Sequence, residues 1–298
     1  MPAVDDEACA NCGKHGSDAV KLKNCTACLL VKYCGVDCQK AHRKQHKGAC
    51  KKRAAELKDE RLYSQGHERS EREFCPICTL PIPLPISDHS GFFVCCMKSI
   101  CNGCFMAARK RGLSDTCPFC RTPLPKNDAD KLAMVQARVS KKDPAACHFL
   151  GLQYCHGRLG LQKDMRKAFE KADEAAELGS ISALFDIGVS YTQGIGVEAD
   201  IEKGVKFFEK GAMQGCAECR YTLGIYEGKK RNYGRAVRHW MISANMGHEN
   251  SLENIKKLFM NGAVTKEQYT EALRGYQVAV EETKSHEREE AKKLEQRK

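Results

Sequence analysis

Residues 185–215 read FDIGVSYTQGIGVEADIEKGVKFFEKGAMQG, and the pattern of this stretch recurs at 148–179 and at 221–247. In each copy an Asp or Asn stands four residues before a small residue, and each copy ends at a glycine. Asp and Asn begin helices because their side chains accept the unpaired amide hydrogens of the first turn. Glycine ends helices because it adopts the left-handed conformation freely. The capping residues are Asp164, Asp200 and Asn232, and the glycines are Gly179, Gly215 and Gly247.

The repeated pattern predicts stacked helix pairs over 144–247. Small residues recur in the second helix of each pair and aromatic residues recur at facing positions. A helix pair of this length cannot bury its apolar face alone, so the stack forms one continuous core. The frame LG-x₂-Y-x₂-G-x-G-V-x₂-D-x₂-KA, followed by AA-x₂-G, resembles the Sel-one-like repeats, which are relatives of the tetratricopeptide family. The resemblance implies three such repeats in an all-α helical-repeat solenoid.

Residues 248–283 are expected to form a degenerate capping repeat. Thr265 and Gln268 have the spacing of a capping box. Apolar residues follow at helical spacing and would cover the end of the stack. Residues 284–298 are almost all charged, which predicts a charged tail.

Cysteine is concentrated before the repeats. Of 19 cysteines, seven lie in 1–50, eight in 75–120 and four beyond. No run approaches the roughly 20 apolar residues of a membrane span, and the acidic start MPAVDDEACA does not have the pattern of a secretory signal. We therefore expect a cytoplasmic or nuclear protein without a membrane partner. Reducing compartments do not sustain structural disulfides, so dense cysteine there indicates metal.

The first cysteine block has the spacing C-x₂-C-x₁₂-C-x₂-C-x₅-C-x₃-C-x₇-H-x₃-C. A C-x₂-C step allows one turn to present two sulfurs to one ion, and eight ligands make two tetrahedral sets. Fifty residues bury little core, so bound metal must supply folding free energy. The ligand row is Cys9, Cys12, Cys25, Cys28, Cys34, Cys38, His46 and Cys50.

This block, with KYCGVDCQ at 32–39 and HKGAC at 46–50, resembles the MYND zinc finger and predicts such a domain at 1–50. The resemblance implies a protein-interaction module with interleaved ligands. His15 and His42 fall outside the pattern and are expected to be solvated. Gln39 matches the family's peptide groove, whereas Arg43 stands where the family commonly has Trp. The implied sets are Cys9, Cys12, Cys34, Cys38 and Cys25, Cys28, His46, Cys50.

After a charged helical linker at 51–73, the second block has the spacing C-x₂-C-x₁₆-CC-x₄-C-x₂-C-x₁₂-C-x₂-C. It resembles an all-cysteine RING finger and predicts a domain at 74–125. Successive strand side chains point to opposite faces, so Cys95 and Cys96 both ligate one ion only if the backbone bends there; otherwise one is a bystander. The sets implied by the resemblance are Cys75, Cys78, Cys101, Cys104 and Cys95, Cys96, Cys117, Cys120.

The RING resemblance implies non-covalent catalysis, because such fingers orient a ubiquitin-conjugating enzyme and its thioester-linked ubiquitin. By the same resemblance, Ile77, Pro118 and Arg121 would contact that enzyme or ubiquitin. Many active RING fingers carry a Trp in the helix after the sixth ligand. Here Phe105 is the available partial substitute.

The formal charge of +11 counts every cysteine as neutral. Fifteen zinc-bound thiolates and four zinc dications would lower it by seven, to +4. Much of the basic charge therefore balances metal centres, and a nucleic-acid partner is disfavoured.

The expected fold is multidomain, with two small cross-braced zinc-finger domains followed by the helical solenoid. Four Zn²⁺ ions are expected. The leading functional hypothesis is a RING-type ubiquitin ligase whose MYND finger and repeats select protein or peptide partners. The alternative is a non-enzymatic zinc-finger adaptor.

Overall fold

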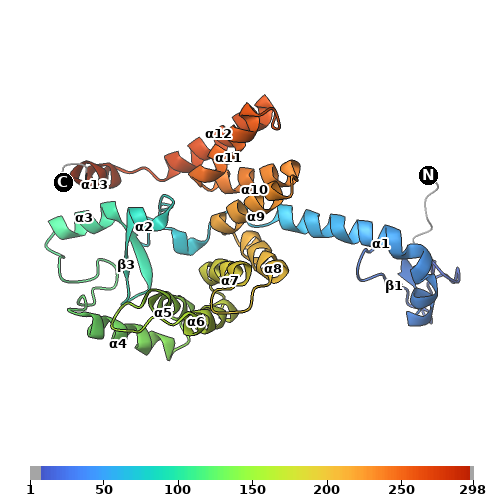
Figure 1. Ribbon diagram of the computed structural model, residues 1–298, viewed down its shortest axis with the longest axis horizontal. Coiled ribbons are helices and arrows are strands. Elements are labelled where there is room, and N and C mark those ends of the chain that lie inside the picture. Colours follow the sequence, from blue (N-terminus) through green and yellow to red (C-terminus); the bar gives the residue numbers. More distant parts are fainter. Residues whose placement is uncertain (1–7, 296–298) are drawn as a thin grey trace. The chain divides into compact units, whose positions relative to one another are not determined.

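The computed structural model describes residues 8–295 and divides the chain into two compact units, at 1–64 and 65–298 (Figure 1). The first seven residues of the finger expected at 1–50 and the last three of the tail expected at 284–298 lie outside the described residues. We call 9–50 the first finger and 74–125 the second finger.

The first unit holds the first finger and one long helix. Strand β1 (Lys23–Asn24) pairs antiparallel with β2 (Lys32–Tyr33), and helix α1 runs from Val36 to Ser64. The start of α1 lies inside the finger and carries its last three ligands. Beyond the finger the helix continues as a charged, largely exposed segment, in which Arg53 pairs with Glu56 and Glu60, and only Leu62 and Tyr63 near its end are buried. The expected helical linker is thus a direct extension of the finger's own helix up to Ser64.

The second finger is built on a short hairpin and a helix. Strand β3 (Ser90–Phe93) pairs antiparallel with β4 (Lys98–Cys101), and α3 (Asn102–Lys110) follows directly. Before the hairpin lie the 3₁₀ turn η1 (Glu71–Glu73) and the short helix α2 (Ile86–His89). Ile82, Phe93 and Ile100 form a small apolar core with the ligand cysteines.

Beyond the second finger the chain is helical. Helix α4 (Asp128–Val139) leads into three antiparallel pairs of helices, then α11 (Glu249–Met260) and α12 (Lys266–Glu282). The pairs are α5 (Pro144–His156) with α6 (Met165–Glu177), α7 (Ile181–Gln193) with α8 (Ile201–Met213), and α9 (Ala217–Lys229) with α10 (Tyr233–Asn245). The expected fold class, zinc-binding fingers followed by a helical-repeat solenoid, is confirmed.

Helix ends follow the capping pattern with one exception. Asp164 accepts a hydrogen bond from the amide of Lys167, and Asp200 accepts one from Lys203. Asn232 makes no cap; its side-chain amide instead donates to Glu227 across the shortened loop. The expected capping box at Thr265 is present at the start of α12. The three repeat-ending glycines, Gly179, Gly215 and Gly247, all have left-handed backbone angles.

Within the repeats, glycines allow an aromatic ring of the partner helix to lie directly on the backbone. Any Cβ at Gly224 of α9 would collide with the indole ring of Trp240 in α10. The indole nitrogen donates to the carbonyl oxygen of Tyr221, 3.1 Å away. Gly188 of α7 meets the ring of Phe208 in α8 in the same way. Close approach between paired helices therefore depends on these glycines.

The charged segment after α12 forms helix α13 (His286–Glu295), which packs against α3 of the second finger. A Cβ at Gly103 of α3 would lie 2.6 Å from the backbone nitrogen of Arg288, so the two helices touch through backbone. Lys110 and Glu290 form an ion pair at 2.8 Å across the same contact. The segment at 284–295 is therefore an ordered part of the second unit.

In the second unit the helices follow an arc from α4 to α12, and the second finger lies in its open side (Figure 1). At one end of the arc, Val94 and Met97 pack into a shared core with Val135 and Leu150. At the other end the finger meets α13. Between the two, the backbone at Gly66 lies against the end of α8, where a Cβ would meet the carbonyl oxygen of Ala212.

Replacing Gly224 with Ala should lower the stability of the solenoid by about 1–3 kcal/mol, because the new methyl group forces the buried Trp240 aside. Gly234→Ala is the matched control. Gly234 lies in α10 with no atom near its Cβ position, so Ala there should stabilise the helix by up to about 1 kcal/mol. Midpoints of thermal unfolding followed by circular dichroism measure both, and equal shifts would contradict the packing described.

Candidate metal centres and the surrounding surface

Four groups of sulfur and imidazole ligands lie close together, each with all its ligand atoms within 4.8 Å of one another. Each group joins two pairs of ligands that are separate in sequence, and the two groups of each finger interleave along the chain. These are the sets that the family resemblances implied. They are Cys9, Cys12, Cys34, Cys38; Cys25, Cys28, His46, Cys50; Cys75, Cys78, Cys101, Cys104; and Cys95, Cys96, Cys117, Cys120.

The donor sets fit zinc. Tetrahedral zinc–thiolate coordination places sulfurs about 3.8 Å apart. The Sγ atoms of Cys25 and Cys50 are 3.8 Å apart, and those of Cys78 and Cys101 are 3.9 Å apart. Sulfur with imidazole, without carboxylate, is the donor chemistry of structural zinc sites. Four structural zinc sites follow, as expected.

The thiols within one tetrad differ in pKa. Burial, followed by the charge of the neighbouring Cys117, raises the pKa of Cys96 to about 12. Burial also acts to raise the pKa of Cys120, but hydrogen bonds with Thr122 and Cys95 outweigh it and lower that pKa to about 6. A bound zinc ion stabilises thiolates and releases their protons.

Four C-x₂-C loops of the fingers have the same backbone geometry, whereas the Cys101–Cys104 pair lies at the start of α3. The residue after the second cysteine is left-handed, and its amide donates to the carbonyl oxygen of the first cysteine at 2.8–3.0 Å. Only one of the four is a glycine. The other three carry a local backbone cost of roughly 1 kcal/mol each, which the turn and its metal offset. The four residues are Gly13, Leu29, Thr79 and Arg121.

His42 was expected to be solvated, and this is wrong. Its ring stacks on that of the ligand His46, with centroids 5.7 Å apart, and its Nδ1 lies 3.1 Å from the hydroxyl of buried Tyr33. The two histidines are four residues apart on α1, so they share one face of the helix. His42 therefore holds the ring of His46 in place. The four-residue spacing of the two histidines in the sequence could have indicated this contact.

Cys95 and Cys96 both belong to one tetrad because the backbone bends between the two strands of the hairpin. The amide of Cys96 donates to the carbonyl oxygen of Phe93, and Met97 is left-handed. This turn brings both thiols to the same side, where they meet Cys117 and Cys120.

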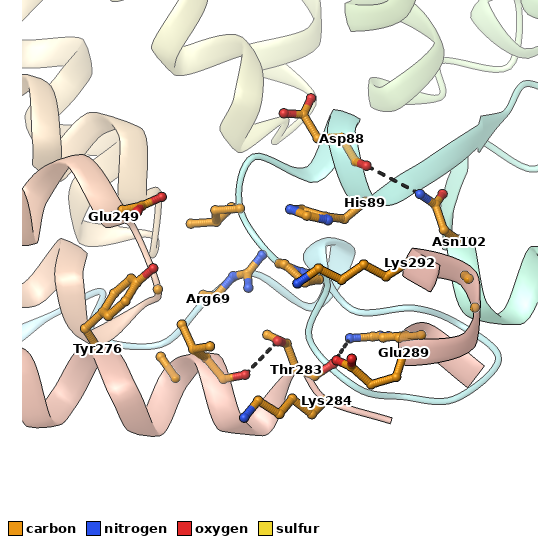
Figure 2. Close-up of a pocket in the computed structure, with 18 residues that line it drawn as sticks. Arg69, Asp88, His89, Asn102, Glu249, Tyr276, Thr283, Lys284, Glu289 and Lys292 are labelled. Carbon is orange, nitrogen blue, oxygen red and sulfur yellow. Dashed lines mark hydrogen bonds between the residues drawn. The ribbon is translucent and has the colours of Figure 1, made fainter. Parts of the chain in front are cut away.

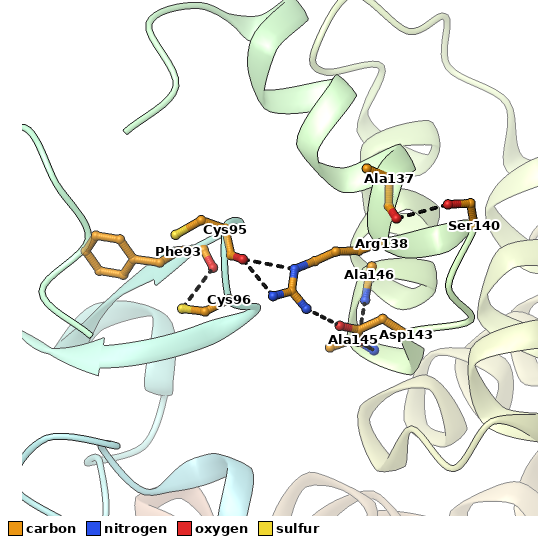
Figure 3. Close-up of polar contacts among 9 residues, drawn as sticks. All are labelled: Phe93, Cys95, Cys96, Ala137, Arg138, Ser140, Asp143, Ala145 and Ala146. Atoms are coloured by element: carbon orange, nitrogen blue, oxygen red, sulfur yellow. Dashed lines mark hydrogen bonds and ion pairs between the residues drawn. The ribbon is translucent and has the colours of Figure 1, made fainter. Parts of the chain in front are cut away.

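Arg138 of α4 holds the backbone of this site (Figure 3). Its Nε and Nη2 donate to the carbonyl oxygen of Cys95 at 3.0 and 2.7 Å, and its Nη1 pairs with Asp143 at 2.6 Å. Asp143 in turn accepts from the amides of Ala145 and Ala146, so it also begins α5. One arginine thus links a zinc ligand to the start of the first repeat, a contact that sequence spacing does not reveal.

Arg288 of α13 has the corresponding role at the other site of the second finger. Its Nη2 donates to the Sγ of Cys78 at 3.3 Å and to the carbonyl oxygen of Leu80. Its Nη1 donates to the carbonyl oxygen of Pro81. Four thiolates around one zinc ion carry a net charge of −2, so a guanidinium on one sulfur offsets part of that charge.

The residues expected to meet a conjugating enzyme differ in exposure. Ile77 lies in the first C-x₂-C loop and is 43% exposed. Arg121 is exposed after the last loop, whereas Pro118 is buried. Phe119 is 42% exposed and occupies in the last loop the position that Ile77 has in the first, with the ammonium of Lys98 4.8 Å from its ring centre. Sequence reasoning missed Phe119, although the parallel CPIC and CPFC loops indicate it.

Comparison with known proteins identifies two modules. The MYND finger matches residues 9–50, and the Sel1 repeat matches 144–180, 181–216 and 217–248. The chain therefore contains a MYND zinc finger and three Sel1 repeats, both of them protein-interaction modules. Together with the four tetrads, this makes the protein a zinc-binding interaction protein.

Curated relatives match about a third of the chain. DAP3-binding cell death enhancer 1 of Rattus norvegicus is 35% identical over 100 residues, which are 32% of this chain and 19% of that protein. Chitin synthase regulatory factor 3 of Schizosaccharomyces pombe is 29% identical over 106 residues, 34% of this chain and 11% of that protein. The chain thus spans less than a fifth of the length of these relatives.

Among solved structures, a Sel1 repeat protein from Oxalobacter formigenes has a TM-score of 0.47 at 23% identity, covering 60% of this chain and 71% of that one. The c5321 protective antigen of uropathogenic Escherichia coli, which displays an SLR fold, also has a TM-score of 0.47, at 22% identity, covering 62% of this chain and 38% of that one. Across residues 8–295, no helix has the length and apolar character needed to cross a bilayer.

Elemental analysis of freshly purified protein should give four zinc ions per chain. Because Cys95 and Cys96 both belong to one tetrad, Cys95→Ser and Cys96→Ser should each reduce the content to about three. Cys155→Ser, which changes a thiol outside the tetrads, should retain four. A Cys96→Ser protein that keeps four tightly held ions would contradict the assignment of Cys96 as a ligand.

Arg138→Met should accelerate zinc loss from the Cys95 site about 10- to 100-fold, because the carbonyl oxygen of that ligand loses both of its guanidinium donors. The measurement is the rate of zinc transfer to a chromogenic chelator. Arg166→Met, which removes an exposed arginine from α6, should leave every phase unchanged. Identical traces for the two variants would show that Arg138 does not support the site.

Proposed function

We propose that this protein is a RING-type ubiquitin ligase whose MYND finger and Sel1 repeats select its protein partners. One observation carries the proposal. In the second finger the first and third cysteine pairs make one tetrad and the second and fourth pairs make the other, and exposed Ile77 and Arg121 lie on the two outer loops of that cross-brace. This ligand order and these two positions resemble those of the RING family, which supports the proposal.

In such a ligase the zinc ions hold the loops in place, and the finger catalyses transfer by orienting the reactants. It binds a ubiquitin-conjugating enzyme and its thioester-linked ubiquitin in a reactive arrangement, which lowers the entropic part of the barrier. The side chains of Ile77 and Phe119 offer apolar surface to the conjugating enzyme. The guanidinium of Arg121 offers a planar set of donors that can bridge the enzyme and ubiquitin.

We assign Pro118 a role different from that of its neighbours. Because it is buried, it contributes to this surface by fixing the shape of the last C-x₂-C loop, while Phe119 supplies the exposed ring. The apolar contact of the last loop therefore lies one residue later than the family resemblance alone suggests.

Partner selection is assigned to the MYND finger and the repeats. Leu29, Leu30 and Val36 are exposed on the first finger, and apolar side chains left in water favour a protein partner. Gln39 is half-buried near the start of α1, and exposed Arg43 stands where the family commonly has Trp. A peptide with an acidic residue beside its apolar positions suits this surface better than a purely apolar one.

A non-enzymatic adaptor is the second candidate, and one contact favours it. Phe105, the residue available in place of the Trp of many active RING fingers, packs edge-on against Phe93 at 5.7 Å inside the finger's core. A ring held in this way contributes less surface to a conjugating enzyme than an exposed indole.

Self-ubiquitination with a panel of conjugating enzymes tests the proposal. Arg121→Ala should reduce transfer about ten- to a hundredfold, because charge-assisted contacts of this kind contribute roughly 1.5–3 kcal/mol. Ile77→Ala should mainly weaken binding of the conjugating enzyme. Alanine at 121 has the same left-handed backbone cost as arginine, so the zinc sites should persist.

Arg111→Ala removes an exposed arginine from the end of α3 and serves as the control, with transfer expected to match the wild type. If wild-type protein transfers ubiquitin and neither Arg121→Ala nor Ile77→Ala lowers the rate, the proposed surface is wrong. If wild-type protein with four bound zinc ions transfers none with any enzyme of the panel, the adaptor is the function that remains.

A further inference from the structure

Helix α13 contacts the loop that carries Ile77. Arg288 of α13 lies 210 residues from Cys78 in the sequence, yet it donates to the Sγ of that ligand at 3.3 Å. It also donates to the carbonyl oxygens of Leu80 and Pro81. The carbonyl oxygen of Leu80 accepts the amide of the loop's first cysteine at 3.0 Å, which closes the base of the loop. The base of the first C-x₂-C loop is therefore held in part from α13.

Few apolar contacts hold α13 in this position. Among residues 286–294, whose side chains the structure describes, only Ala291 is buried. The side chains of Lys110 and Glu290, which pair across the contact with α3, are both about half exposed, and such pairs contribute little stability in water. A helix of ten residues is also only marginally stable by itself. Docking on the finger therefore keeps α13 folded.

On another side α13 borders a cavity of about 590 Å³ (Figure 2). Glu289 and Lys292 of α13 line this cavity, together with His89 of α2 and Asn102 at the start of α3. Part of the inner side of α13 thus faces open volume and polar groups instead of a packed apolar core. This arrangement makes release of α13 from the finger less costly.

The opposite end of the finger is packed differently. There Val94 and Met97 share one buried apolar cluster with Val135 of α4 and Leu150 of α5. Burial of apolar surface stabilises this contact, so the finger stays joined to α4 and α5 when α13 is released. Of the two arginines that contact the metal ligands of this finger, Arg288 is the one on the weakly held helix.

We propose that docking of α13 controls binding of the ubiquitin-conjugating enzyme to the second finger. This inference rests on the proposed ligase function and gives its site a form of regulation. With α13 docked, Arg288 holds the first C-x₂-C loop in the shape that presents Ile77. When α13 is released, the loop loses these donors, moves more freely and binds the enzyme more weakly. Arg288 is a positioning residue, because it acts through the loop.

The proposed control acts in both directions. If docking of α13 strengthens binding of the conjugating enzyme, bound enzyme must strengthen docking of α13 by the same factor. Support of the zinc site alone would not produce this reciprocal effect. Stabilisation of α13 by bound enzyme is therefore the signature that separates regulation from a structural role of Arg288.

Gly103→Ala tests the proposal without changing Arg288 or a zinc ligand. The new methyl group would lie 2.6 Å from the backbone nitrogen of Arg288, so it displaces α13, whereas alanine suits α3 as a helix residue. Arg288→Met removes the donors and leaves α3 unchanged. Lys293→Met is the matched control, since it removes an exposed cation from the same helix. Zinc analysis and circular dichroism establish that each variant is folded.

Isothermal titration of the full-length zinc-loaded protein with each conjugating enzyme of the panel measures the affinity. Gly103→Ala and Arg288→Met should each weaken binding about fivefold or more, and Lys293→Met should bind like the wild type. In ubiquitin transfer the loss should appear as a higher KM for the enzyme with little change in kcat. Amide hydrogen exchange at residues 77–80 should be faster in both variants, and exchange in α13 of the wild type should slow when the enzyme is bound.

The proposal is overturned if the wild-type protein binds a conjugating enzyme and both variants bind it as tightly as Lys293→Met does. It is also overturned if saturation with the enzyme leaves hydrogen exchange in α13 unchanged. A wild-type protein with four zinc ions that binds no enzyme of the panel would overturn the ligase function, and this form of control with it. The behaviour of the wild type thus tests the ligase function, and the variants test the role of α13.

Discussion

Zinc–thiolate coordination at the second finger is the constraint on which the second unit depends. The finger's own apolar core is little more than Ile82, Phe93 and Ile100 with the ligand cysteines. So small a core cannot hold a hairpin, a helix and two loops in fixed positions, and the metal bonds supply the remaining free energy. Once held, the hairpin presents Val94 and Met97 to the first helices of the solenoid, and α3 presents Gly103 to α13.

Two arginines connect the metal sites of the second finger to the helices by hydrogen bonds. Arg138 binds the carbonyl oxygen of Cys95 and the residue that begins α5, while Arg288 binds the sulfur of Cys78 and lies in α13. The finger and the repeats are therefore coupled through the ligands themselves rather than through a flexible connection. The second finger and the repeats therefore belong to one compact unit.

The ligand residues and the repeats could be predicted because their signals are local, whereas the grouping of the ligands into tetrads was implied by the resemblance to MYND and RING fingers. A C-x₂-C step or an Asp four residues before a small residue has the same physical meaning wherever it stands. The place of α13 could not be predicted, because its charged sequence has no apolar periodicity and its anchor, Arg288, binds backbone carbonyl oxygens that every residue possesses. Asn232 shows that a local signal can also mislead. Its residue type suits a helix cap, but in the shortened loop its side chain binds Glu227 instead.

The position of the second finger also bears on how this chain can evolve. In an ordinary solenoid each repeat touches only its neighbours, so copies are gained or lost with little effect on the rest. Here the finger touches α4 and α5 at one end of the arc and α13 at the other. An additional helix pair would move α13 away from α3. Loss of a helix pair would shorten the arc, and its two ends would then clash with the finger. The contacts of the finger at both ends of the arc therefore constrain the number of repeats between them.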